Sequence, residues 1–343
     1  MRFLPRSLKI IYQRESNFEK MEKFEICHPS SADLTNLKTL FLNYPFKLFQ
    51  QKFQGIKKEI LAEFFAEGFL SSSNLKDSIS YIIKTEDEIL SAGSVGSNSW
   101  HTQNFGIQMG KISTFITYPD QKKFGNILID LLLDEAKKLN LKHLSCRLDA
   151  DDWENIHLLE SMGFYLVDCS IKFGLKLPSS VQPSKDTRIE ILPYTGKYLE
   201  QIMEIASTSH QINHFYADKN LPGVKTQQLF ANWVKKLSDG KAQSIFVALK
   251  DSLPIGFVIF LENKAFNQKL GLKIAILDYV VLDSKLQGRG FGSELLAHSL
   301  NYLNKFYDQV ELRTSHNNYQ ALNTYQKFGF KIISTDIVLH YLL

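Results

Sequence analysis

Hydrophobic and polar positions predict alternating strands and helices in the second half of the chain. Two β-rich runs, at 244–249 and 255–261, flank Lys-Asp-Ser-Leu-Pro, which predicts a hairpin. The run 273–282 has few polar residues, as expected for a strand with both faces covered. The elements expected after it are a helix from about 293 to 306, a strand at 309–314, a short helix at 318–327 and a closing strand at 331–341.

The first half of the chain repeats this order of elements. Aligning Gly125 with Gly292 brings the helices and strands into step. With that alignment, Gly163-Phe164 matches Gly329-Phe330, which indicates an internal duplication of one α/β unit. The elements expected in the first copy are a strand at 112–117, a loop at 118–125, a helix at 127–138, a strand at 143–148, a helix at 153–162 and a strand at 166–177.

A polar segment with two prolines, residues 178–187, separates the two copies and is typical of a linker. We therefore expect a first domain at 21–178, a linker at 179–187 and a second domain at 188–343. Residues 1–20 are basic but have neither a continuous apolar stretch nor a small-residue cleavage site. They are expected to be an unstructured extension or the result of an upstream start, rather than a signal peptide.

The composition argues against several classes of protein. With 44% hydrophobic and 22% charged residues among 343, the chain is globular and long enough for two domains. A net charge of +4 without a lysine–arginine stripe gives no indication of a nucleic-acid partner, and no apolar run is long enough to span a membrane. Three cysteines without a CxxC pair predict neither a disulfide framework nor a zinc site, as in a cytoplasmic protein.

A glycine-rich loop, Gln287-Gly-Arg-Gly-Phe-Gly292, lies between the apolar strand and the helix that follows it. Three glycines let the backbone turn tightly and leave its N–H groups uncovered, beside the positive end of the helix. Such a loop is a receptacle for a pyrophosphate. The alternatives are an ordinary strand-to-helix turn and a dinucleotide fingerprint, which would need a glycine where Ser293 stands.

Two blocks of the second half resemble conserved motifs of the GNAT superfamily of acyl-CoA-dependent acetyltransferases. They are Gln287-x-x-Gly290-x-Gly292 and Asn318-x-x-Ala321-x-x-x-Tyr325-x-x-x-Gly329-Phe330. The resemblance implies two tandem GNAT-like domains of the α/β (α+β) class, with mixed, mostly antiparallel sheets that are flanked by helices and splay where acetyl-CoA enters. The loop of the first half keeps one glycine of three, so that half resembles a degenerate GNAT domain that binds no cofactor.

The resemblance implies acetyl-CoA as co-substrate and assigns residues to it. The loop would hold the pyrophosphate, with Arg289 adding a charged contact, and the strand before it would pair with the pantetheine arm. Asn318 would steady the cofactor from the second helix, although a helix N-cap is a nearly equal alternative for it. The expected cofactor-binding residues are Val280, Val281, Leu282, Gln287, Gly288, Arg289, Gly290, Phe291, Gly292, Ser293 and Asn318.

Tyr325 is the expected general acid for the departing thiolate. It lies seven residues after Asn318, two helical turns on, so that both project from nearly one face. Its phenol, with an ordinary pKa of about 10, would protonate a thiolate of about 8.5, which is uphill by about 2 kcal/mol unless the site lowers the phenol's pKa. The alternative is a core residue with a satisfied hydroxyl.

Two carboxylates are candidates for the general base. Asp278 lies on the strand that leads to the loop and is expected to share a face with Val280 and Leu282. Glu262 ends the preceding strand. Either would relay a proton from the amine through water, and the alternative is that the amine binds already deprotonated. The amine attacks the thioester directly, so that neither a covalent enzyme intermediate nor a metal is expected.

Softer matches resemble tandem acetyltransferases that act on nucleotide-linked amino sugars, the type that acetylates TDP-4-amino-4,6-dideoxygalactose (TDP-fucosamine). The segments are Trp100–Gly106, Leu158–Phe164, His214–Asp218 with Trp233, and His340–Leu343. A primary amine on a small molecule is the expected acceptor. Another small amine, a protein amine and a non-catalytic acyl-CoA-binding module are the alternatives. A homodimer is open, since edge strands of such sheets can pair.

Overall fold

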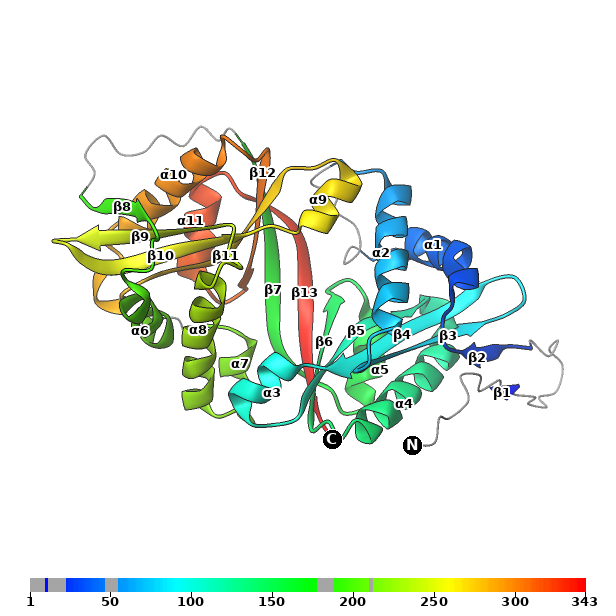
Figure 1. Cartoon of the computed structure of the whole chain (residues 1–343). Coiled ribbons are helices and arrows are strands. Elements are labelled where there is room, and N and C mark those ends of the chain that lie inside the picture. Colours follow the sequence, from blue (N-terminus) through cyan, green and yellow to red (C-terminus); the bar gives the residue numbers. More distant parts are fainter. Residues whose placement is uncertain (1–9, 12–22, 47–54, 178–187, 210–211) are drawn as a thin grey trace. The chain divides into compact units, whose positions relative to one another are not determined.

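The computed structural model describes residues 10–11, 23–46, 55–177, 188–209 and 212–343. It divides into two compact units, residues 1–166 with 336–343 and residues 167–335, which we call the first and the second unit. Figure 1 labels the elements of both. The predicted linker at 179–187 lies outside the described residues.

The second unit is built on a mixed sheet with the strand order β7-β12-β11-β10-β9-β8. Neighbouring strands are antiparallel except β11 and β12, which run parallel. The four strands predicted between 244 and 314 are confirmed to within two residues, whereas β8 was not predicted. The strands are β7 (Tyr165–Lys176), β8 (Glu190–Pro193), β9 (Ser244–Lys250), β10 (Leu253–Leu261), β11 (Ile274–Leu282) and β12 (Gln309–Ser315).

Helices cover both faces of this sheet. Ile202 of α6 and Val234 of α8 are buried in a core on one face, which we call the α8 face. Leu295 of α10 and Tyr325 of α11 are buried in a core on the opposite face, the α10 face. The predicted flanking of a mixed sheet by helices is therefore confirmed. The helices are α6 (Leu199–Ser209), α7 (His214–Ala217), α8 (Gly223–Ser238), α9 (Lys264–Leu270), α10 (Phe291–Leu303) and α11 (Tyr319–Lys327).

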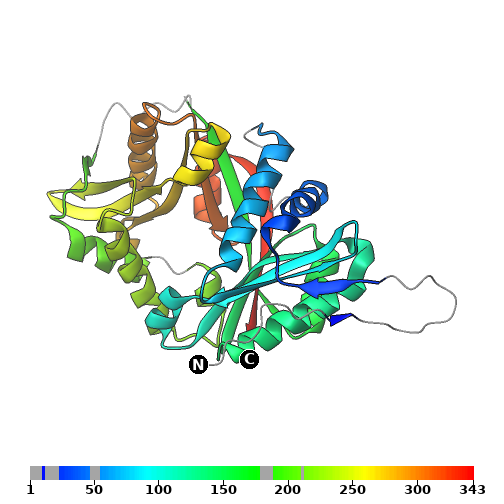
Figure 2. The ribbon, with the colours of Figure 1, turned by 45° about the vertical axis from the view of Figure 1, so that its right-hand side comes forward.

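The first unit follows the same plan, with the strand order β1-β2-β3-β4-β5-β6-β13 and with β5 parallel to β6. Figure 2 shows the ribbon turned by 45° about the vertical axis. Leu37 of α1 and Ala66 of α2 lie in one core, and Leu128 of α4 and Leu159 of α5 lie in another. The strands are β1 (Ile10–Ile11), β2 (Glu25–Cys27), β3 (Ser78–Lys84), β4 (Ile89–Ser97), β5 (Met109–Thr117), β6 (His143–Asp149) and β13 (Lys331–Leu342). The helices are α1 (Leu34–Asn43), α2 (Lys58–Ser73), α3 (Ser99–Phe105), α4 (Lys122–Lys138) and α5 (Trp153–Ser161).

Two predictions for the first copy need correction. Residues 122–125, predicted as part of a loop, already belong to α4, because no glycine-rich segment interrupts the helix there. Ile10–Ile11, within the predicted unstructured extension, forms β1 and pairs with β2. The rest of residues 1–20 lies outside the described residues.

The two units repeat the same irregularities in their sheets. Parallel pairing covers four residues in each, Met109–Ile112 of β5 and Ile274–Leu277 of β11. The next residue is in each case the extra residue of a β-bulge, Ser113 against β4 and Asp278 against β10. A bulge at the same position of both strands supports the duplication that the sequence indicates.

The end strands of the two sequence copies are exchanged between the units. β7 follows the first copy in sequence, yet residues 170–176 pair with β12 of the second unit. β13 ends the second copy, yet residues 336–342 pair with β6 of the first unit. The division of the sequence at 179–187 stays a prediction, and the compact units each include a strand from the other copy.

We expect Leu339→Ala to destabilise the first unit, because Leu339 on β13 is fully buried in its core. Loss of a buried leucine side chain lowers the free energy of unfolding by about 2–5 kcal/mol. Leu342→Ala, on the same strand but 46% exposed, should lower it by less than about 1 kcal/mol. Urea unfolding measures both, and equal losses would show that β13 does not complete this core.

Candidate active site

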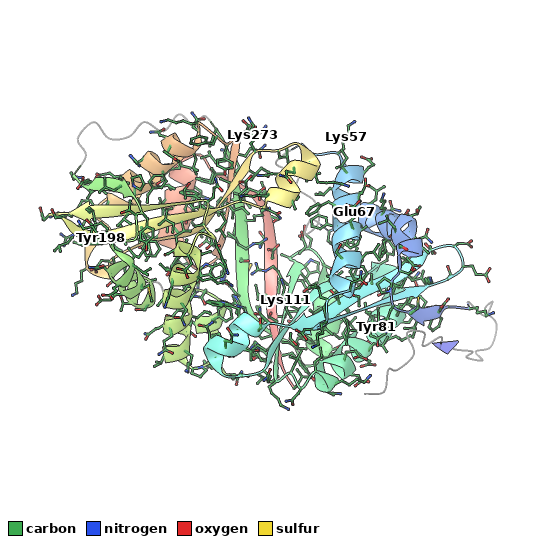
Figure 3. The ribbon with its side chains drawn as sticks, viewed as in Figure 1. Lys57, Glu67, Tyr81, Lys111, Tyr198 and Lys273 are labelled. Carbon is green, nitrogen blue, oxygen red and sulfur yellow. The ribbon has the colours of Figure 1, made fainter. Side chains whose placement is uncertain are left out.

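Strands β11 and β12 pair for four residues and then part. The pairing begins beside Lys273, labelled in Figure 3, whose carbonyl accepts hydrogen bonds from the N–H groups of Asp308 and Gln309 at 2.9 and 3.2 Å. It ends at Leu277, opposite Leu312. Within the described residues, β11 then continues to Leu282 with β10 as its only partner. One edge of residues 278–282 is therefore open to an extended ligand, which can pair with its backbone.

Asp278 lies at the bulge where the two strands part. On β10, Ile259 is opposite Tyr279 and the next residue, Phe260, is opposite Leu277, so Asp278 has no opposite residue. The carboxylate turns towards α8, where Trp233 Nε1 donates a hydrogen bond to Oδ2 at 2.7 Å.

The prediction that Asp278 shares a face of the sheet with Val280 and Leu282 is wrong. Val280 and Leu282 pack in the core of the α10 face, whereas the hydrogen-bond partner Trp233 packs against the core of the α8 face. The bulge is the physical reason, because one extra residue interrupts the alternation of side chains along β11. Burial raises the pKa of the Asp278 carboxyl above its ordinary value, and the hydrogen bond from Trp233 opposes that rise. A carboxyl with a raised pKa is a better proton acceptor when ionised.

Glu262, the other candidate base, is engaged at the opposite end of β11. Its Oε1 accepts a hydrogen bond from Asn267 at 3.1 Å, and its Oε2 accepts one from the Tyr307 hydroxyl at 3.2 Å. β10 ends just before Glu262, at Leu261, which lies opposite Ile276 near the start of β11. The carboxylate therefore joins the end of β10 to α9 and to the segment after α10, away from the glycine loop.

The glycine-rich loop turns through conformations that favour glycine. Gly288 and Gly290 have φ angles of 75° and 87°, and α10 begins directly afterwards at Phe291. The first backbone hydrogen bond of the helix runs from Ser293 N–H to the Gly290 carbonyl at 3.0 Å. Among the described residues, the N–H groups of 288–292 have no acceptor, as expected at a helix N-terminus that awaits an anion.

Gln287 braces the loop instead of extending from it. Its Nε2 donates to the Leu282 carbonyl at the end of β11 at 3.1 Å and to the Ser209 carbonyl at the end of α6 at 3.5 Å. The side chain thus holds the loop against the two elements that flank it. Binding of a phosphate at this place would depend chiefly on backbone N–H groups.

Arg188 reaches the same loop from the segment just before β8. Its Nε donates to Glu294 Oε1 at 2.7 Å, and its Nη1 donates to the Arg289 carbonyl at 2.9 Å. Glu294 lies in the first turn of α10, where its negative charge would oppose an anion, and the guanidinium offsets that charge. Sequence analysis missed this residue, because the contact spans 106 residues and no local motif marks it.

Asn318 is the N-cap of α11. Its side-chain oxygen accepts from Ala321 N–H at 3.4 Å, and its Nδ2 donates to Thr314 Oγ1 at 3.1 Å. The capping alternative therefore holds for this residue, and a contact with cofactor stays a prediction.

Tyr325 lies on the α10 face with its ring against Phe173 of β7 and Phe330, at centroid distances of 6.0 and 5.7 Å. It is 5% exposed, and its hydroxyl has no hydrogen-bond partner among the described residues. Burial raises the pKa of the phenol well above its ordinary value. The protein alone thus makes Tyr325 a poorer acid than free tyrosine, while it keeps the hydroxyl protonated as a hydrogen-bond donor.

The corresponding region of the first unit is filled by its own side chains. Asp152, which aligns with Asn318, accepts a hydrogen bond from the Tyr44 hydroxyl, and both residues are buried. Asn155 Nδ2 donates to the Thr117 carbonyl at the end of β5 at 3.0 Å. Four residues, 118–121, connect β5 to α4, where eight residues, 283–290, connect β11 to α10. This unit lacks the loop for a pyrophosphate.

Comparison with known proteins agrees with this geometry. Residues 199–330 match the acetyltransferase (GNAT) family. A GCN5-related N-acetyltransferase from Sphaerobacter thermophilus has a similar structure, with a TM-score of 0.65 and 12% identity over 93% of this chain and 95% of that one. A tandem GNAT protein from the clavulanic acid biosynthesis pathway, solved without AcCoA, gives a TM-score of 0.55 and 12% identity over 93% and 98%. No curated protein matches the sequence.

A further similar structure is a GCN5-related glucosamine N-acetyltransferase region of a fungal multi-domain GH3 β-N-acetylglucosaminidase. Its TM-score is 0.64, with 11% identity over 95% of this chain and 39% of that one. At such identities the likeness shows the fold. No helix among the described residues has the length and apolar character that a membrane span requires. Residues 199–330 are thus an acetyltransferase domain of the GNAT family on a tandem GNAT fold, and the chain is an acyltransferase whose co-substrate is acetyl-CoA.

Proposed function

We propose that the second unit transfers the acetyl group of acetyl-CoA to a primary amine by direct attack in a ternary complex. The observation that carries this proposal is the parting of β11 and β12 directly before the glycine loop. The open edge of 278–282 suits an extended acyl-pantetheine arm, and the free N–H groups of 288–292 suit its pyrophosphate.

In this proposal, backbone groups make most of the contacts with acetyl-CoA, and side chains hold the loop in place. Val280, Val281 and Leu282 would pair with the pantetheine amides through their open edge. Backbone groups from Gly288 to Ser293 would hold the phosphates, while Gln287 and Arg188 keep the loop in place. Asn318 would act from the start of α11, next to the same opening.

In the proposed reaction, the amine nitrogen forms a bond to the acetyl carbon, and the bond between that carbon and sulfur breaks. Asp278 accepts the proton that the nitrogen loses, and Tyr325 donates a proton to the departing thiolate. The Asp278 side chain turns to the α8 face, and Tyr325 belongs to the α10 face. A thioester in the opening between the strands would therefore meet a base and an acid from opposite sides.

The acceptor that we propose is an amino sugar, in particular one linked to a nucleotide. The α8 face, to which the candidate base turns, carries several aromatic rings. Trp233 donates a hydrogen bond to Asp278, and Phe230 lies 5.8 Å from Tyr279 and 6.1 Å from Tyr216 between ring centroids. Such rings can pack against the apolar face of a sugar, and a carboxylate can pair with its ammonium group. The similar fold of a glucosamine N-acetyltransferase region is compatible with this choice.

We expect about one acetyl-CoA to bind per chain, because the first unit lacks the loop for a pyrophosphate. Calorimetric titration measures the stoichiometry, and release of free thiol with a panel of nucleotide-linked amino sugars, polyamines, amino acids and peptides measures transfer. Absence of binding would contradict the proposal. Binding without thiol release for any amine would favour a non-catalytic acyl-CoA-binding module.

Gly290→Ala should weaken the affinity for acetyl-CoA by about tenfold or more. The φ angle of Gly290 is 87°, where a side chain strains the backbone, and an added Cβ would lie 2.8 Å from Arg188 Nη2, so the guanidinium that holds the loop must move. Gly240→Ala is the matched control, because Gly240 has a φ of 83° but open space around the added Cβ. Calorimetry on both variants distinguishes an effect of the loop from an effect of backbone strain elsewhere. If both variants bind acetyl-CoA with equal affinity, the loop is not the phosphate site.

Tyr325→Phe should lower the rate of transfer by about 10²–10⁴-fold while it leaves the affinity for acetyl-CoA nearly unchanged. The variant removes the hydroxyl and keeps the ring against Phe173. Tyr319→Phe on the same helix, where the side chain is 69% exposed, should change neither quantity. Thiol release and calorimetry give the two numbers, and unchanged turnover would exclude Tyr325 as the acid.

A further inference from the structure

We propose that Trp233 is a positioning residue for acetyl transfer: its indole N–H holds one carboxylate oxygen of Asp278, so that the other oxygen faces the acceptor amine. This inference rests on the proposed function. It adds a residue of α8 to the site, and it makes the acceptor a group that binds as an ammonium ion. That ion releases one proton to solvent, and the neutral amine then attacks and gives a second proton to Asp278.

The contact is specific in its geometry. Trp233 Nε1 donates to Asp278 Oδ2 at 2.7 Å, and within the described residues Oδ1 has no hydrogen-bond partner. Asp278 is partly exposed, and Oδ1 is the carboxylate oxygen that Trp233 leaves available to a ligand. The pair lies at the bulge, at the first residue of β11 beyond its pairing with β12.

A purely structural role does not account for a carboxylate at this position. The neighbouring side chains of the α8 face are apolar or aromatic, and an aliphatic residue would fill the space without the cost of desolvating a charge. The indole N–H needs an acceptor when buried, but a backbone carbonyl would serve. A carboxylate with one oxygen held and one free is instead suited to take a proton from a bound amine.

A second polar atom nearby also lacks a partner. The Tyr216 hydroxyl is buried with no hydrogen bond among the described residues, and its ring stacks on Phe230 at an interplanar angle of 4°. Tyr216 and Asp278 both lie close enough to Tyr279 to help raise the pKa of its phenol, after burial, which is the larger cause. Buried polar groups without partners are rare in proteins, and this hydroxyl, on the face to which Asp278 turns, supports that face as the place where an acceptor would bind.

The groups around Asp278 leave Trp233 as the main influence that favours its ionised form. The titratable neighbours are Tyr216 on α7, Tyr279 on β11 and Lys236 on α8, whose Nζ lies 5.1 Å from the Trp233 ring. Burial raises the pKa of Asp278, and the indole N–H lowers it. Loss of that donor should therefore raise the pKa further, so that the carboxylate is present only at higher pH.

Carbon-detected NMR of the full chain with labelled aspartate carboxyls tests this inference without a known acceptor. Asp278→Asn identifies the Asp278 signal by its disappearance. In Trp233→Phe, which keeps an aromatic ring, the midpoint of that signal should move to higher pH by about one unit. Trp153→Phe is the control, because Trp153 is 61% exposed in the first unit, and it should leave the midpoint unchanged.

Ethylammonium serves as a minimal cationic amine in a second measurement on the unmodified protein. It should lower the Asp278 midpoint, because a cation beside the free oxygen stabilises the carboxylate. An unchanged midpoint in Trp233→Phe would overturn the positioning role. No effect of ethylammonium would overturn the acceptor contact, even if Trp233→Phe fails to fold. Calorimetric titration of the unmodified protein with acetyl-CoA tests the proposed function separately. If acetyl-CoA binds, a negative result in either NMR experiment contradicts only the role of Trp233 or the acceptor contact.

Discussion

The site depends on one constraint: two parallel strands that pair for four residues and then separate. β11 keeps its antiparallel partner β10, and β12 keeps β7, so each strand stays ordered after the two part. The opening therefore exposes a backbone edge without unfolding either strand. The bulge at Asp278 coincides with the point of separation, where it turns a carboxylate away from the face that carries Tyr325.

At the glycine-loop end of the opening, a positively charged side chain offsets a negatively charged one. The start of α10 offers uncovered N–H groups, but Glu294 brings a carboxylate into its first turn. Arg188 pairs with that carboxylate and holds the loop through the Arg289 carbonyl, while its guanidinium lies 5.0 Å from the Phe291 ring centroid. Only the Glu294 side of this ion pair is buried, since the Arg188 side chain is 54% exposed. Loss of Arg188 would leave the buried Glu294 carboxylate without its partner, beside the N–H groups that we propose hold the phosphates. The geometry of the loop thus relies on a residue outside the motif.

The sequence allowed the strands, the helices and the glycine loop to be predicted, because each depends on local periodicity or on the conformational range of glycine. It did not reveal Arg188, which meets Glu294 across 106 residues. Nor did it place Asp278 on the correct face, since a bulge is decided by the partner strand and leaves no mark in a single run of residues. The helical start at Lys122 was missed because one remaining glycine, Gly125, suggested a loop that tertiary packing does not form.

The exchange of end strands bears on how the chain can fold during its synthesis. The first unit needs residues 336–342 to complete its sheet beside β6, although most of its core lies before residue 166. Until those residues leave the ribosome, β6 has an open edge that other chains can pair with. The first copy would therefore stay incompletely closed until residues 336–342 have been synthesised. We therefore expect the two units to complete their folding together. Until then the β6 edge is exposed, and a chaperone that covers it would prevent pairing with other chains.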